Sequence, residues 1–142
     1  MTVKAKQHEV TTLPAPVTSG AVDGPPRLIL RAEGAVLLVA SLIAFAATDQ
    51  TWWLVPALLF VPDLFMAGYA RSSRFGARLY NLAHSYPLPA LAGGFALWQD
   101  TLVLQGVCAV WFAHIGMDRL LGYGLKHDDS SHHTHLGMIG RS

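Results

Sequence analysis

Hydrophobic residues along the chain form four long runs that are separated by short polar stretches. The runs cover residues 28–47, 52–70, 79–98 and 101–125. Each is close to the ~20 apolar residues that a helix needs to cross the hydrocarbon core of a bilayer. The pattern predicts an all-α fold, namely an integral membrane four-helix bundle with four transmembrane helices.

The second and third runs are interrupted in ways that a membrane helix tolerates. Pro56 and Pro62 lie inside the second run, where neighbouring groups must satisfy the carbonyls that they free. The third run begins with the polar sequence YNLAHSYP and continues through Gly93 and Gly94, which favour close helix approach. Between these two runs, we expect residues 71–78 to form a charged loop.

The positive charges predict how the bundle is oriented. Every Lys and Arg lies before the first run, between the second and third, after the fourth, or at the adjoining ends of the runs. The other two connections contain Asp49 and Asp100 but no positive charge, so the positive-inside rule places both termini in the cytoplasm. Trp52, Trp53 and Trp98 fall at the outer boundary, as interfacial aromatics do. We therefore expect a multi-pass protein of the cell inner (plasma) membrane, with the lipid bilayer as its partner.

The two ends of the chain differ from its middle. Residues 1–26 lack the apolar core of a signal peptide and are predicted to be a disordered cytoplasmic leader. Residues 27–125 form the predicted four-helix transmembrane domain. Residues 126–142 form a histidine-rich cytoplasmic tail, for which two interpretations stay open: a solvated segment, or one that folds back over the helix ends.

Composition narrows the function classes. Hydrophobic residues make up 52% of the chain and charged residues 13%, against ~25% charged in a typical soluble domain. The net charge is +1 and no basic patch with interleaved aromatics occurs, which argues against nucleic-acid binding. The single cysteine, Cys108, excludes an intramolecular disulfide. The small residues Gly93, Gly94 and Gly106 allow helices to approach closely, either within one chain or between copies in a homo-oligomer.

Acid, amide and imidazole side chains inside the runs fall almost entirely in the half of the bundle nearer the cytoplasm. Such groups are costly in hydrocarbon and mark a site or a buried polar network. His114 and Asp118 are four residues apart, on one face of a helix. The other polar residues in this half of the bundle are Glu33 in the first run, Asp63 in the second, and Asn81 and His84 in the third.

Carboxylate and imidazole ligands without a nearby thiolate fit a divalent metal such as Zn, Mn or Fe. The predicted metal ligands are Asp63, His84, His114 and Asp118, joined by His135 if the tail folds back. Glu33 is a candidate general base and Arg119 a candidate substrate-binding group, with Arg31 and Asn81 as further polar site residues.

These residues support two hypotheses from different classes. The first is a metal-dependent hydrolase that acts on a lipid or another amphiphilic substrate, using a water activated by the ion. The second is a non-enzymatic membrane component, such as a small transporter, a proton relay or a scaffold, whose polar cluster is structural.

Several short motifs resemble those of one known family. The runs are RAEG (31–34), the Pro62–Asp63 pair, YNLAHSYPLP (80–89), HIGMDRLLGYGLK (114–126) and THLG (134–137). Together they resemble the small integral-membrane family called domain of unknown function 4260, from Leu28 to Gly137. The resemblance implies no activity, but it implies that THLG, with His135, belongs to the domain. The His and Asp residues are also faintly similar to those of membrane-bound metal-dependent hydrolases induced in DNA damage, whose histidine-rich N-terminal motif is absent here.

Overall fold

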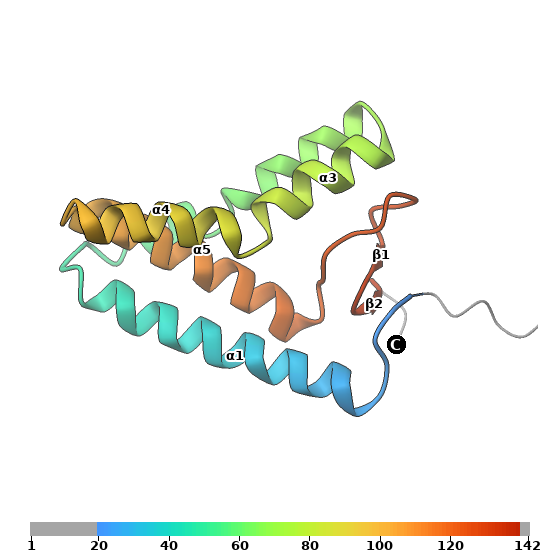
Figure 1. Ribbon diagram of the computed structural model, residues 1–142, viewed down its shortest axis with the longest axis horizontal. Helices are drawn as coiled ribbons and strands as arrows, with labels where there is room; N and C mark the ends of the chain where they lie inside the picture. The colour runs from blue at the N-terminus through green and yellow to red at the C-terminus, as the bar shows by residue number, and fades with distance from the viewer. Residues whose placement is uncertain (1–19, 140–142) are drawn as a thin grey trace, which may run out of the picture.

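The computed structural model describes residues 20–139, and this part of the chain is mostly helical (Figure 1). The predicted all-α class is therefore confirmed. Most of the predicted leader, residues 1–19, lies outside the described residues. The helices are α1 (Pro25–Ala46), α2 (Leu54–Leu58), the 3₁₀ helix η1 (Pro62–Ala70), α3 (Ser73–Ala83), α4 (Pro87–Trp98) and α5 (Leu102–Leu121). A two-stranded antiparallel hairpin of β1 (His133–Thr134) and β2 (Gly137–Met138) follows.

Helix α5 is the centre of the fold. It packs against α1 along much of its length and also contacts α4 and α2, whereas α3 pairs with η1 and projects away from this group (Figure 1). The backbones of α1 and α5 approach each other closely at Gly34 and Gly116. A Cβ added at Gly116 would lie 2.6 Å from the backbone nitrogen of Leu38, and one added at Gly94 would meet nothing within 4 Å. A close helix approach is therefore found at Gly34 and Gly116 rather than at the Gly93–Gly94 pair.

The second hydrophobic run is not a continuous α-helix. Helix α2 ends at Leu58, and η1 begins at Pro62, which has no backbone N–H to donate. The amides of Asp63 and Leu64 bond to carbonyls three residues earlier, at 3.2 and 3.1 Å. The tighter 3₁₀ turn that results places Asp63 at the start of η1.

The third run does not form the single helix over 79–98 that the sequence predicts. Helix α3 begins earlier, at Ser73, so most of the expected loop 71–78 forms its first turns; the hydroxyl of Ser72 caps it by accepting from the Phe75 amide at 3.2 Å. The helix then breaks before Pro87, whose missing N–H cannot bond to the carbonyl of Ala83. That freed carbonyl accepts instead from Nε1 of Trp111, at 2.7 Å. The break leaves His84 at the end of α3.

Residues 126–139 of the tail fold back over the helix ends. This is the second of the two interpretations that the sequence left open. Thr134 and Leu136 are fully buried. Backbone hydrogen bonds join His135 to Leu125 at 3.0 Å, and Val22 donates to the carbonyl of His135 at 2.8 Å. The hairpin therefore connects the segment before α1 to the segment after α5.

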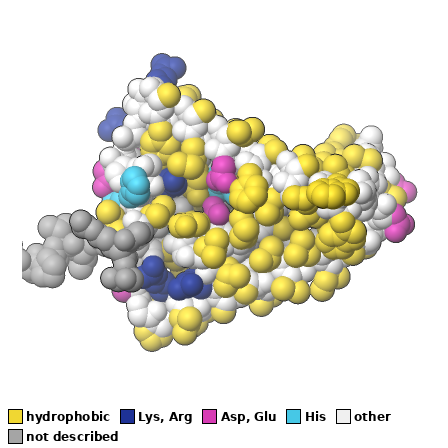
Figure 2. Space-filling view, turned by 180° about the vertical axis from the view of Figure 1, so that it is seen from behind, with side chains coloured by type: hydrophobic (Ala, Val, Ile, Leu, Met, Phe, Trp, Pro, Cys, Tyr) yellow, Lys and Arg dark blue, Asp and Glu magenta, His cyan; other side chains and the backbone are white. Residues whose placement is uncertain are grey.

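The outer surface of the fold is largely apolar. Hydrophobic side chains cover most of the body of the face seen in Figure 2. Lys and Arg lie at one end of it, whereas acidic side chains lie at both ends and near its middle. Within residues 20–139, one helix, α1, is long and apolar enough to cross a membrane by its length and composition.

Candidate metal site

Four of the predicted ligands converge on one point. Asp63 comes from the first turn of η1, His84 from the end of α3, and His114 and Asp118 from one face of α5. One potential ligand atom from each of these residues lies within 4.8 Å of all the others. Three separate elements thus supply a group that could hold a metal ion.

The distances within this group fit a small ion. Nε2 of His84 lies 2.9 Å from Nε2 of His114 and 3.3 Å from Oδ1 of Asp63. Nε2 of His114 lies 3.7 Å from Oδ1 of Asp63 and 3.7 Å from Oδ2 of Asp118. A tetrahedral ion with ligands at about 2.0–2.2 Å holds them about 3.3–3.6 Å apart. For these four pairs, shifts of a few tenths of an ångström would reach the separations that such an ion requires.

The ring of His84 is held in the form that binds a metal. Its Nδ1 lies 2.9 Å from the carbonyl oxygen of Tyr80, which can only accept, so Nδ1 carries the proton and donates. In the neutral ring, Nε2 then presents a lone pair to the centre, as in metal sites whose histidines are oriented by backbone carbonyls. That lone pair faces the oxygens of Asp63 and Asp118, at 3.3 and 3.7 Å. Three acceptors so close repel one another, and either a cation or a proton between them removes this repulsion.

Burial makes this need for positive charge stronger. The side chains of His84 and His114 are 3% and 0% exposed and that of Asp118 is 11% exposed, whereas Asp63 is 39% exposed. Buried carboxylates are paired or coordinate metals, because an isolated charge is costly away from water. With neutral imidazoles, Asp63 and Asp118 contribute a charge of −2, which one divalent ion balances.

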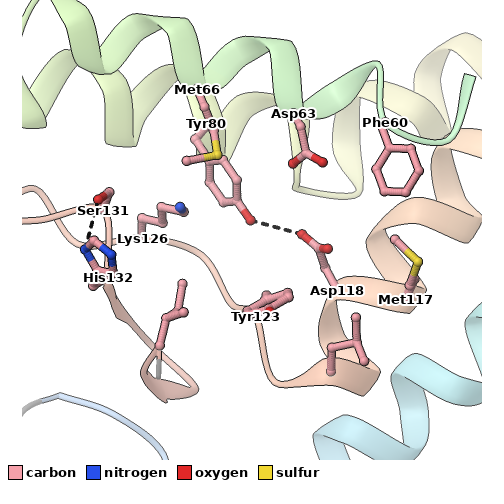
Figure 3. A pocket seen from close by; sticks show the side chains of 12 residues that line it. Phe60, Asp63, Met66, Tyr80, Met117, Asp118, Tyr123, Lys126, Ser131 and His132 are labelled. Carbon is pink, nitrogen blue, oxygen red and sulfur yellow. Dashed lines mark hydrogen bonds between the residues drawn. The ribbon is translucent and has the colours of Figure 1, made fainter. Parts of the chain in front are cut away.

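Tyr80 holds two members of the group in place, although the sequence analysis did not select it as a site residue. Its hydroxyl donates to Oδ2 of Asp118 at 3.0 Å (Figure 3), and its ring stacks on His84 with centroids 3.6 Å apart. The sequence did contain a sign of this role: Tyr80 lies four residues before His84, and this spacing places both side chains on one face of a helix.

Replacing Tyr80 with phenylalanine tests this supporting role. The variant keeps the stacked ring but loses the hydrogen bond that orients Asp118, and loss of such an outer partner weakens metal affinity about 10–100-fold. We expect that loss in a Zn²⁺ competition titration, with the helical circular dichroism unchanged. Tyr123→Phe, at an exposed position, is the matched control and should bind Zn²⁺ like the wild type; equal affinity of Tyr80→Phe and wild type would contradict the role.

A cavity of about 640 Å³ opens beside the group, and Asp63, Tyr80 and Asp118 are part of its wall (Figure 3). Most of the wall is apolar and is formed by Phe60, Met66, Met117, Leu121, Tyr123 and Ile139. The tail contributes Ser131 and His132.

Lys126 is the cation in this wall, and sequence reasoning did not select it. The residue is 6% exposed, and its Nζ lies 4.3 Å from the centre of the Tyr80 ring. Burial lowers the pKa of Lys126, while the carboxylates of Asp118 and Asp63 oppose that shift. Asn81 fixes the backbone here: its amide donates to the carbonyl of Lys126 at 2.9 Å and accepts from the Lys126 amide at 2.7 Å. This predicted site residue therefore holds the chain that carries Lys126.

The structure does not bring Glu33 or Arg31 to the group. Glu33 is exposed on α1, which packs on the side of α5 that holds Gly116 rather than on η1 or α3. Nε of Arg31 donates to the carbonyl of Leu120 at 2.8 Å and so holds the end of α5.

Arg119 and His135 also lie apart from the four ligands. The guanidinium of Arg119 stacks over the ring of Tyr86 at 5.5 Å, and its NH1 lies 3.2 Å from Nε2 of His135. Nδ1 of His135 accepts from the Leu125 amide at 2.8 Å. Burial, and then the positive charge of Arg119, lower the pKa of His135 and favour its neutral ring. In this arrangement His135 holds the tail in place.

These features define an all-α protein with a buried His–Asp group that could hold a metal ion. The family model for domain of unknown function 4260 matches residues 27–139, and the chain belongs to that family. Comparisons with curated proteins and with solved structures gave no match.

Proposed function

We propose that this chain is a membrane-embedded, metal-dependent hydrolase that acts on a lipid or another amphiphilic molecule. The convergence of Asp63, His84, His114 and Asp118 beside a largely apolar cavity is the observation that carries this proposal. It supports a divalent ion such as Zn²⁺, Mn²⁺ or Fe²⁺, because the ligands are carboxylates and imidazoles.

The outside of the fold supports its placement in a membrane, with four spans and both termini in the cytoplasm. Leu28, Val36, Ile43, Leu64 and Leu91 are each more than 60% exposed. Apolar surface on this scale exceeds what soluble monomers expose. Trp53 and Trp98, about 80% exposed, lie beside the turns containing Asp49 and Asp100. The opposite end carries the described Lys and Arg residues, as the positive-inside rule requires.

The two broken spans support the same placement. Irregular backbone is tolerated at membrane depth where it is buried in protein or lines a cavity, and broken helices of membrane proteins commonly carry binding sites. Here the 3₁₀ turn at Pro62 precedes Asp63, and the break before Pro87 follows His84. Both interruptions therefore deliver a ligand to the site.

The site has the parts that hydrolysis requires. When bound, a divalent ion of this kind lowers the pKa of a coordinated water to about 7 and polarises a substrate oxygen. The four side chains would hold the ion with a fifth position left for that water. Asp63, the more exposed carboxylate in the cavity wall, would bind the ion through one oxygen and accept a proton from the water through the other. Tyr80 holds Asp118 in position, and the largely apolar wall can accommodate the hydrocarbon part of the substrate.

Hydrolysis of chromogenic substrates tests the proposal. With the protein in nanodiscs, we expect cleavage of p-nitrophenyl octanoate or of p-nitrophenyl octyl phosphate that a chelator abolishes and Zn²⁺ or Mn²⁺ restores. Asp118→Asn should reduce the rate by at least ~100-fold, in the range that a lost catalytic group costs. Asp128→Asn is the matched control, since its carboxylate is half exposed and pairs with Arg74. Cleavage that persists in chelator, or no cleavage at any metal loading, would contradict the proposal.

One observation favours a second function, a proton relay. Nε2 of His84 and Nε2 of His114 are 2.9 Å apart, so a single proton on His114 can bridge the two rings without any metal. Chains of acidic and histidine side chains within membranes carry protons in this way. Proton flux through the protein in vesicles, abolished in His114→Gln and insensitive to chelator, would identify this function instead.

A further inference from the structure

Lys126 is a buried cation without a counter-ion in direct contact. Among residues 20–139, no carboxylate oxygen lies within salt-bridge distance of its Nζ, and its contacts are with the faces of Tyr80 at 4.3 Å and Tyr69 at 5.6 Å. Charged groups in protein interiors are normally paired. An aromatic face offsets only part of the cost of burying an ammonium.

The charge balance of the cavity shows what is missing. In the proposed enzyme, one divalent ion neutralises Asp63 and Asp118, the two acids in the wall. Lys126 then leaves the cavity with a net charge of +1. One tyrosine lies between the two features, because the hydroxyl of Tyr80 bonds to Asp118 and its ring face holds Nζ (Figure 3).

The rest of the wall specifies the remainder of the ligand. The side chains of Phe60, Met66, Met117 and Leu121 offer no charge and no strong hydrogen-bonding group. Methionine side chains also adapt to flexible apolar partners. A ligand that satisfies the whole cavity therefore has a negative headgroup near Lys126 and a hydrocarbon chain against this wall.

We infer that the substrate of this site is an anionic amphiphile whose headgroup, a phosphate or a carboxylate, pairs with Lys126 beside the metal group. This inference deepens the proposed function and rests on it, because without the ion the two carboxylates would exceed the charge of Lys126 and leave no positive charge for an anion to balance. The anion fills the place of the absent counter-ion, and the hydrocarbon chain lies against the apolar part of the wall.

Calorimetric titration of the Zn²⁺-loaded protein in phosphatidylcholine nanodiscs tests the inference. The probes are octyl phosphate, octanoate, neutral octyl glucoside and inorganic phosphate. We expect octyl phosphate or octanoate to bind at least ~10-fold more tightly than octyl glucoside, which a single charge-assisted contact can supply. Inorganic phosphate should bind at least ~10-fold more weakly than octyl phosphate, because it lacks the hydrocarbon chain.

Three variants separate the role of Lys126 from general effects of charge. Lys126→Met should weaken binding of the anionic amphiphile at least ~10-fold and leave octyl glucoside binding unchanged. Lys126→Arg keeps the charge and should recover most of the affinity. Arg78→Met is the matched control and should bind like the wild type, because its side chain is 71% exposed and lies outside the cavity wall.

Metal content measured on the same samples separates the failure of this inference from that of the proposed function. Equal binding of octyl phosphate by wild type and Lys126→Met, with metal retained in both, would overturn the inference alone. A wild-type sample without metal would overturn both. If Lys126→Met does not fold, the wild-type protein alone tests the inference. Wild-type protein that binds octyl glucoside as tightly as the anionic probes would contradict an anion-pairing site.

Discussion

Replacing His114 with alanine is expected to abolish tight binding of a divalent metal. The ring is fully buried, and its Nε2 lies within 3.7 Å of three other candidate ligand atoms. Removing it takes one of four ligands from the site, so the loss of affinity should exceed the ~10–100-fold that follows from losing an outer-shell partner. Competition titration with a Zn²⁺-binding dye on tag-free protein measures this loss.

Two further variants make the result interpretable. His114→Gln fills most of the space without supplying an imidazole, and should lose the metal while keeping the helical circular dichroism. His132→Ala/His133→Ala removes two histidines of the tail and should bind Zn²⁺ like the wild type. Loss of metal from the tail variant, with retention in His114→Gln, would place the metal in the tail and contradict the proposed site.

Replacing Gly116 with valine should produce the largest loss of stability. A Cβ at this position would lie 2.6 Å from the backbone nitrogen of Leu38 and 2.8 Å from the carbonyl oxygen of Gly34. Backbone atoms cannot move aside as a side chain can, so α1 and α5 would have to separate. Overpacking of a well-packed interior lowers the free energy of unfolding by about 1–3 kcal/mol. Because the added side chain would meet backbone atoms, we expect Gly116→Val to lie at or above the upper end of that range.

Thermal denaturation in detergent, followed by circular dichroism, measures the effect of Gly116→Val. Gly94→Ala is the matched control, because a Cβ at Gly94, in the middle of α4, meets nothing within 4 Å. Alanine there should leave stability unchanged or raise it by about 0.5–1 kcal/mol through helix propensity. A Gly116→Val protein that melts like the wild type would mean that α1 and α5 do not pack through this glycine.

The helical class and most of the metal group could be predicted from the sequence. The i, i+4 spacing of His114 and Asp118 fixes their common face on any helix. The hydrophobic runs located α1 and α5, and the Asp49 and Asp100 turns were expected as short connections; both aspartates adopt positive φ angles there, 55° and 50°. These features are local, which is why a pattern along the chain reveals them.

The helix breaks were harder to predict because they depend on contacts between distant segments. Hydropathy alone favours one helix over 79–98. The helix instead breaks before Pro87, and Trp111 of α5 satisfies the carbonyl of Ala83 that the break leaves free. Lys126 looked like an ordinary tail cation, and its burial follows from Asn81, 45 residues earlier. Glu33 and Arg31 share their depth with the site, but the rotation of α1 is set by Gly34 against α5, and this rotation was not visible in the sequence.

The central claim is that Asp63, His84, His114 and Asp118 together bind a metal ion in the native protein. The most direct measurement is the metal content, by mass spectrometry, of protein purified without a histidine tag from cells grown in metal-replete medium. The account predicts about one divalent ion per chain, and its absence from a His84→Ala/His114→Ala variant that remains helical. Wild-type protein with no stoichiometric metal, or a double variant that retains it, would contradict the account.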